Sequence, residues 1–258
     1  MEIRDYSQQA NIGIKQNNWQ NWLKSAVLLG TGLYMLVLLL TGNIGHYVNV
    51  ANPSILWLSW LTVPLLLSLG GWSLWRTLKP APPSATPANQ SRLTTTALVI
   101  CTLPLILGLL PSRPLGADAI NGGVNIAPLG LTSGTSVNIA PEDRTVLDWL
   151  REFGRLGDPT VLNGETVDVI GFVYREPNMA ENQFMVARFT MSCCVADAYA
   201  IGLPVIYEGA PDLAEGSWVH IQGTLQVGTF RPGDDPLPII TPTLVEPTDE
   251  PDSAYLYS

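Results

Sequence analysis

The chain has 258 residues, a formal net charge of −9 and a hydrophobic fraction of 47%. Up to Pro111 there are six basic and two acidic residues, whereas seven arginines and twenty acidic residues follow. The second part is long enough for one ordinary domain. Its acidic surface would repel a phosphate backbone, so nucleic acid is not an expected partner.

The first part of the chain has the composition of a membrane protein. No Asp, Glu, Lys or Arg occurs between Lys24 and Arg76. An uncharged stretch of this length is typical of segments that lie in lipid. The expected spans cover about residues 25–41, 54–75 and 93–110, and together they form a membrane domain over residues 1–111.

The basic residues predict how these spans are oriented. Lysines precede the first span, and three basic residues lie between the second and the third, whereas the loop at 41–53 has none. Short basic loops stay in the cytoplasm. We therefore expect a multi-pass protein of the plasma (inner) membrane with a cytoplasmic N-terminus and an extracytoplasmic C-terminal domain. The domain would be cytoplasmic if 93–110 did not span, and the small residues at 117–119 leave a cleaved internal signal sequence as a less favoured alternative.

A tether and a short helix are expected next. Residues 112–140 are rich in Gly and Asn, which predicts a flexible tether. The phrase VNIAP occurs at 124–128 and again at 137–141, but two copies are too few for a repeat architecture. Pro141 suits the first position of a helix, and Gly154 can end it. The apolar face of this helix, at spacings of three and four, comprises Val146, Leu147, Leu150 and Phe153.

Beyond Leu162 the hydrophobic period changes to two, which predicts strands. Five or six short strands with one helix indicate a mainly-β domain over residues 141–246, a small OB-like β-barrel, with a β-sandwich as the alternative. The last strand contains prolines and is expected at a sheet edge. The acidic residues 247–258 are expected to be a disordered tail. The expected strands lie at 166–174, 184–190, 203–207, 218–226 and 238–245.

Adjacent cysteines form the one motif that could carry chemistry. Cys193 and Cys194 are followed by Asp197, and His220 is the only histidine of this domain. Adjacent residues of a strand point to opposite faces, so both thiols can reach one ligand only if the strand ends there. Two thiolates, a carboxylate and an imidazole are an adequate ligand set for zinc or another transition metal. The spacing matches no paired C-x2-C pattern, so these four residues are metal-site candidates only.

Other interpretations of the cysteine pair stay open. The two residues could form a vicinal disulfide, carry out thiol redox chemistry, for which C-x-x-C is usual, or be buried structural thiols. Cys101, within the third expected span, is interpreted as a packing residue. The sequence contains no G-x-S-x-G, H-E-x-x-H, Walker or G-x-G-x-x-G phrase, and an enzyme is therefore not expected.

The phrase RFTMSCCVADA at 188–198 carries a family resemblance, supported by Gly171-Phe172-Val173 and by the segment 218–224. With the order of spans, linker and C-terminal domain, it resembles the YcgQ-like permease subunits, membrane proteins of the DUF1980 type. The resemblance implies an architecture and a separate multi-span permease subunit as partner. It implies no reaction mechanism.

The expected function is therefore that of a non-enzymatic permease subunit. Its extracytoplasmic β domain would bind a ligand or a metal ion, or gate the partner. One alternative is a membrane-tethered thiol redox protein that uses Cys193 and Cys194. The other is a structural assembly factor.

Overall fold

The computed structural model describes residues 2–79, 100, 103, 106, 113–120, 123–126, 139–156 and 158–257, without the side chains of residues 2–20. The chain divides into two compact units, Met1–Ser112 and Arg113–Ser258. The expected third span at 93–110, apart from three isolated positions, lies outside the described residues, as do residues 80–92 before it and Cys101.

The first unit contains two long helices, α1 (Glu2–Thr41) and α2 (Pro53–Leu78), joined through the short 3-10 helix η1 (Asn43–His46). Asn21–Thr41 and Pro53–Leu78 are long and apolar enough to cross a membrane. Asn52 caps α2 by accepting a hydrogen bond from the Ser54 backbone N–H. The expected first two spans lie within these helices, and α2 continues through Pro64.

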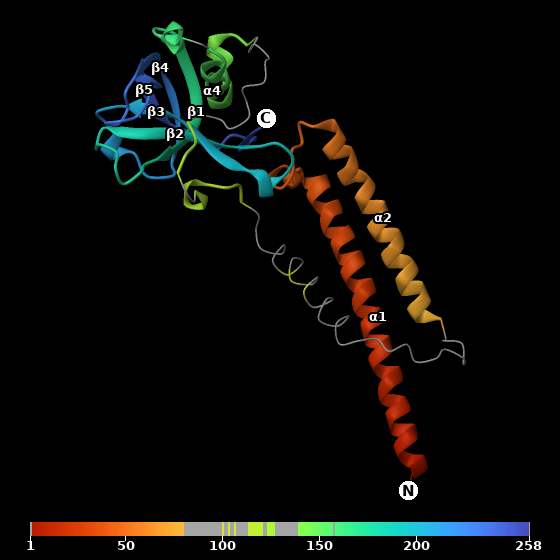
Figure 1. Ribbon diagram of the computed structural model, residues 1–258. Coiled ribbons are helices and arrows are strands. Elements are labelled where there is room, and N and C mark those ends of the chain that lie inside the picture. Colours follow the sequence, from red (N-terminus) through yellow and green to blue (C-terminus); the bar gives the residue numbers. More distant parts are fainter. Residues whose placement is uncertain are drawn as a thin grey trace. The chain divides into compact units, whose positions relative to one another are not determined.

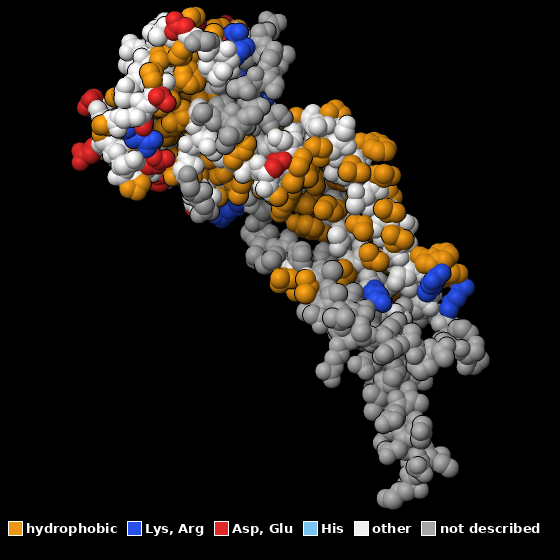
Figure 2. Space-filling model, in the orientation of Figure 1, with side chains coloured by type: hydrophobic (Ala, Val, Ile, Leu, Met, Phe, Trp, Pro, Cys, Tyr) orange, Lys and Arg blue, Asp and Glu red, His pale blue; other side chains and the backbone are white. Residues whose placement is uncertain are grey.

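Small residues let α1 and α2 approach closely. A Cβ atom added to Gly32 would lie 2.9 Å from Leu67 Cδ2, and one added to Gly70 would lie 2.9 Å from Leu29 Cδ2. The buried Ser25 donates a hydrogen bond across the pair to Ser73 Oγ at 2.8 Å. The outward faces carry exposed leucines and tryptophans, as the hydrophobic side chains along both helices in Figure 2 show. Close approach at positions that hold small residues is typical of helices that pack in lipid.

The second unit is built on a closed barrel (Figure 1). The strand order is β1-β4-β5-β3-β2, and β1 also pairs with β2, which closes the barrel. All of these pairs are antiparallel except β3 with β5. This is the order of an OB-like barrel, and it confirms the expected fold. The strands are β1 (Thr166–Tyr174), β2 (Gln183–Met191), β3 (Tyr199–Ile206), β4 (Trp218–Gly228), β5 (Leu237–Pro247) and β6 (Tyr255–Tyr257).

The expected strands are all present, with two differences. β3 begins at Tyr199, four residues before the expected start. β5 does not lie at an edge, because it pairs with β4 along its length and with β3 at Val205 and Ile240. Its prolines are tolerated because the β3 ladder is confined to one pair, and Pro242 lies opposite Gly223, where the register with β4 shifts.

The helix α4 (Val146–Arg155) packs on the core inside the barrel. Thr145 is the N-cap, and it forms a capping box with Asp148. The sequence predicted that Pro141 begins this helix, and this was wrong. Pro141 begins the separate 3-10 helix η3 (Pro141–Asp143). The helix also continues one residue past Gly154. The helix side chains buried against the barrel core are Val146, Leu147, Trp149 and Leu150.

Two segments cover the outside of the barrel. The N-terminal arm, residues 113–120 and 123–126, is held by the bridge between Asn125 and Ile201 of β3. The C-terminal strap, residues 248–257, ends in β6, which pairs in parallel with residues 189–191 of β2. Leu115 N donates a 2.9 Å hydrogen bond to the hydroxyl of Tyr255, so arm and strap are also joined to each other.

These contacts bury a second hydrophobic cluster. Its buried members come from β1, β2, β3 and the strap, and arm residues pack over them. Residues 113–120 and 123–126 of the expected flexible tether and the expected disordered tail therefore differ from the prediction, since both segments bury apolar side chains on the barrel wall. Residues 127–138 of the expected tether lie outside the described part of the chain. The fully or largely buried members are Phe172, Ala187, Phe189, Met191, Ala200 and Tyr255.

Candidate functional site

The cysteine pair lies in the turn between β2 and β3. β2 ends at Met191, and the 3-10 helix η5 (Val195–Asp197) follows directly after Cys194. Because the strand has ended, the two side chains are not forced to opposite faces. The Sγ atoms of Cys193 and Cys194 lie 3.6 Å apart. Since the strand ends before the cysteine pair, both thiols can reach one shared ligand, as the sequence analysis required.

Asp197 folds back onto the same turn. Its carboxylate accepts hydrogen bonds from the backbone N–H groups of Ser192, at 3.1 Å, and Cys193, at 2.8 Å. These bonds fix the turn and direct the carboxylate toward the thiols. One ligand atom from each of Cys193, Cys194 and Asp197 lies within 4.8 Å of the others. The three side chains are exposed or half-buried, so an ion from solvent can reach them.

The charge of Asp197 changes the acidity of the neighbouring thiol. The pKa of Cys193 is raised to about 12, chiefly because its thiol donates a hydrogen bond to the Asp197 carboxylate and secondly because of the Cys194 thiol. Burial works to raise the pKa of Asp197, but hydrogen bonds from the Cys193 thiol and the backbone of the turn outweigh it, so that this pKa is lowered. At neutral pH the turn therefore holds a thiol next to a carboxylate.

This arrangement bears on two of the interpretations that the sequence left open, thiol redox chemistry and metal binding. A redox cysteine needs a lowered pKa, because the thiolate is the reactive form, and Cys193 has the opposite shift. A divalent cation reverses this effect, since it stabilises the thiolates that it binds. Two sulfur atoms and one oxygen are suitable donors for a borderline or soft metal, with a fourth position left for water or another ligand.

His220 is not part of this cluster. It lies on β4, opposite Ile170 of β1 and Glu246 of β5. Its Nε2 atom is 2.5 Å from Asp168 Oδ1, and Gln222 Nε2 donates to the other oxygen of Asp168 at 2.7 Å. The structure thus brings three of the four candidate ligands together and engages the fourth on the barrel wall. Asp168 had no signal in the sequence beyond its alternation with apolar residues on a strand.

Arg188, in the middle of the phrase RFTMSCCVADA, has a different role. Its side chain is buried, with 6% exposure. The guanidinium donates to the backbone carbonyls of Ile170, Ser253 and Ala254, and it lies 5.1 Å from the ring centroid of Trp218. It therefore binds the strap to the barrel wall. Sequence reasoning missed this role, because main-chain acceptors leave no pattern in the side chains.

Part of the C-terminal unit matches a known protein family. Residues 135–258 match the family described as the DUF1980 C-terminal domain. The chain is 32% identical over 94 residues to the UPF0703 protein YcgQ of Bacillus subtilis, covering 36% of this chain and 33% of that protein. It is 25% identical over 99 residues to a Streptococcus mutans protein named "Putative two-component membrane permease complex subunit", covering 38% and 36% of the two chains. The matched segment spans about a third of each relative's length.

These matches confirm the resemblance that the phrase at 188–198 predicts. A solved structure, that of a small single-stranded DNA-binding protein from Streptomyces coelicolor, matches with a TM-score of 0.23 and 15% identity, over 33% of this chain and 94% of that one. The OB-like assignment rests on the strand order of the barrel itself.

Proposed function

We propose that this chain, in which residues 135–258 form a DUF1980 C-terminal domain, is a non-enzymatic subunit of a membrane permease and that its barrel binds a metal ion. The observation that carries the proposal is the convergence of Cys193, Cys194 and Asp197, whose ligand atoms lie within 4.8 Å of one another. Zinc is the ion that this donor set suits first, and softer thiolate-seeking ions come next.

The permease part of the proposal is supported by the relatives and by the helices. One relative is named as a subunit of a two-component complex, and two helices of this chain are suited to cross a membrane. We infer a second, multi-span subunit as partner and lipid around α1 and α2. The distribution of basic residues supports a cytoplasmic N-terminus, with the barrel outside the cytoplasm. The species transported by the partner subunit would be this metal ion, or a solute whose passage the ion controls.

Metal binding by the full chain tests the proposal. The chain is purified in detergent micelles with reductant, and Zn²⁺ binding is followed by native mass spectrometry. Cd²⁺ serves as a second probe, because cadmium–thiolate ligation has its own ultraviolet absorption. We expect one ion per chain and an affinity that rises with pH, because the metal must displace the proton of Cys193.

Single substitutions connect the ion to the turn. Cys193→Ser and Cys194→Ser should each reduce the cadmium–thiolate absorption and weaken binding at least about tenfold, a loss of about 1.4 kcal/mol. Asp197→Asn should weaken binding with the absorption retained. His220→Asn is the matched control, because His220 is engaged with Asp168 and lies outside the cluster. Binding that neither cysteine substitution weakens would contradict the metal site.

The same samples distinguish the alternatives. A mass lower by two hydrogens that reductant restores would favour a redox protein, against the raised pKa of Cys193. A metal-free chain in which Cys193→Ser destabilises the barrel would favour a structural assembly factor. The partner is tested separately, by co-purification of a multi-span protein with the tagged full chain from its own membrane. Failure to recover one would contradict the permease proposal without affecting the metal site.

A further inference from the structure

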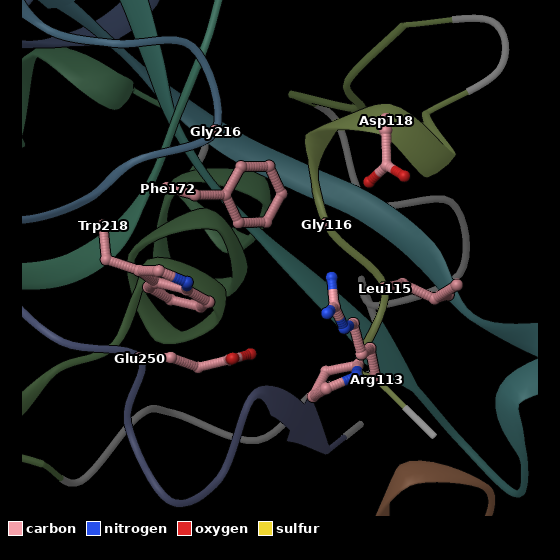
Figure 3. Close-up of a pocket in the computed structure, with 9 residues that line it drawn as sticks. Arg113, Leu115, Gly116, Asp118, Phe172, Gly216, Trp218 and Glu250 are labelled. Carbon is pink, nitrogen blue, oxygen red and sulfur yellow. The ribbon is translucent and has the colours of Figure 1, made fainter. Parts of the chain in front are cut away.

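A pocket lies where the arm, the strap and the barrel wall meet (Figure 3). Its volume is about 480 Å³, within the range of sites for small molecules. The barrel contributes Phe172 and Trp218, which are partners in the register of β1 and β4. The arm contributes Arg113 and Asp118, and the strap contributes Glu250. The pocket therefore joins the arm and the strap, which are more than a hundred residues apart in the chain, to the barrel wall.

The barrel side of the pocket is an aromatic wall. Phe172 and Trp218 pack edge to face, with ring centroids 5.6 Å apart and an interplanar angle of 82°. Arg188 lies over the Trp218 ring and is itself held by three carbonyls, which fixes the indole in place. Such a wall offers a rigid surface for an apolar side chain, and the guanidinium of Arg188 already lies over one face of the indole.

The other sides of the pocket carry opposite charges that are not paired with each other. Figure 3 shows Arg113 and Glu250 pointing toward one another across the space in front of the aromatic rings. Within the described part of the chain, no ion pair or hydrogen bond engages the side chains of Arg113, Asp118 or Glu250. A guanidinium binds a carboxylate with two parallel hydrogen bonds, and a carboxylate beside an aromatic ring binds an ammonium group.

We propose that this pocket binds an apolar α-amino acid in its zwitterionic form. Its carboxylate would bind Arg113, its ammonium group would lie between Glu250 and Trp218, and its side chain would pack on the aromatic wall. Arg188, over the Trp218 ring and within the field of Glu250, adds a second positive charge beside Arg113. The charges around the pocket are therefore balanced once Asp118 is counted, which suits a zwitterion better than a ligand that carries one charge alone. The pocket shares no residue with the turn of Cys193 and Cys194, so this site does not depend on the metal site.

Three probes with one aromatic body isolate the role of each charge. L-phenylalanine carries both groups, 3-phenylpropanoate lacks the ammonium group, and phenethylamine lacks the carboxylate. Binding to the full chain in detergent micelles is measured by calorimetry, with empty micelles as the blank. We expect L-phenylalanine to bind at least about tenfold more tightly than either analogue. Equal binding of the three probes would overturn the proposal. The absence of L-phenylalanine binding at a ligand concentration of about 10 mM would overturn it as well.

Two substitutions of exposed residues identify the pocket as the place of binding. Arg113→Gln should weaken L-phenylalanine about tenfold and leave phenethylamine unchanged, whereas Glu250→Gln should weaken both ligands that carry an ammonium group. Asp235→Asn, an exposed carboxylate outside the pocket, is the charge-matched control. Circular dichroism confirms that each variant is folded. Binding of L-phenylalanine that neither pocket substitution weakens would also overturn the proposal.

Discussion

Replacing Arg188 by methionine should release the strap from the barrel. The guanidinium donates to the carbonyls of Ile170, at 3.2 Å, and Ala254, at 3.2 Å, and to that of Ser253. Methionine keeps much of the apolar volume and leaves these three acceptors without the donor that they have now. The change therefore tests the hydrogen bonds rather than the packing.

The magnitude follows from two opposing effects. A hydrogen bond from a charged donor contributes about 1.5–3 kcal/mol, so three contribute at least roughly 5 kcal/mol. Burial opposes this gain: it lowers the pKa of Arg188 from 12.5 to about 10, against a smaller raising effect of Glu250, which corresponds to a cost of roughly 3 kcal/mol. The difference predicts that Arg188→Met destabilises the docked strap by at least about 2 kcal/mol.

Hydrogen exchange measures this effect where it arises. Protection of the amides of β6 should fall by at least about thirtyfold, because each 1.4 kcal/mol is a factor of ten, whereas amides of β4 and β5 should change much less. Arg155→Met is the control, because its ion pair with Glu152 lies at the surface of α4. Wild-type protection of β6 in Arg188→Met would refute the reasoning, since it would mean that the three bonds give no net stabilisation.

Three further changes test other parts of the domain. Asp197→Asn should speed alkylation of Cys193 at pH 8 about tenfold, measured with the other cysteines replaced by serine. The reason is that the Cys193 pKa of about 12 falls, so that the thiolate fraction rises more than the nucleophilicity of the thiolate declines. An unchanged rate would mean that the Asp197 carboxylate does not hold the thiol proton. Gly223→Ala should destabilise the barrel by about 2 kcal/mol or more in urea unfolding, because the new Cβ would lie 2.4 Å from a β5 carbonyl oxygen. Gly228→Ala on the same strand, with its nearest contact at 3.6 Å, should be nearly neutral, and equal effects would contradict the steric cause. Thr145→Ala should cost about 1 kcal/mol through loss of the α4 cap, and no change in unfolding free energy would remove the capping box as a source of stability.

The barrel was predictable because its signals are local. Alternation of apolar and polar residues marks β1 at its observed bounds, 166–174, and finds β2 and β4 to within two residues at each end. The turn after Met191 was also within reach, since Asp197 can fold back on the residues just before it. Local sequence therefore identified three residues of the candidate metal site.

The remaining features depend on contacts between distant residues. The placement of His220 required the register of β4 against β1, which sets it beside Asp168. The arm and the strap have no hydrophobic period of their own, because each contributes a few apolar side chains to a wall made by other strands. The edge position expected for β5 was wrong for a similar reason, since the cost of its prolines depends on how its neighbours pair with it.

The arm has a practical consequence for anyone who prepares the barrel as a separate fragment. The family match begins at residue 135, and a fragment cut there would lack the arm that packs over Phe172 and Phe189. Those aromatic side chains would then face water as a contiguous apolar patch, which promotes association between copies. A fragment that begins at Arg113 keeps the arm over these side chains. We expect the shorter fragment, which begins at residue 135, to precipitate.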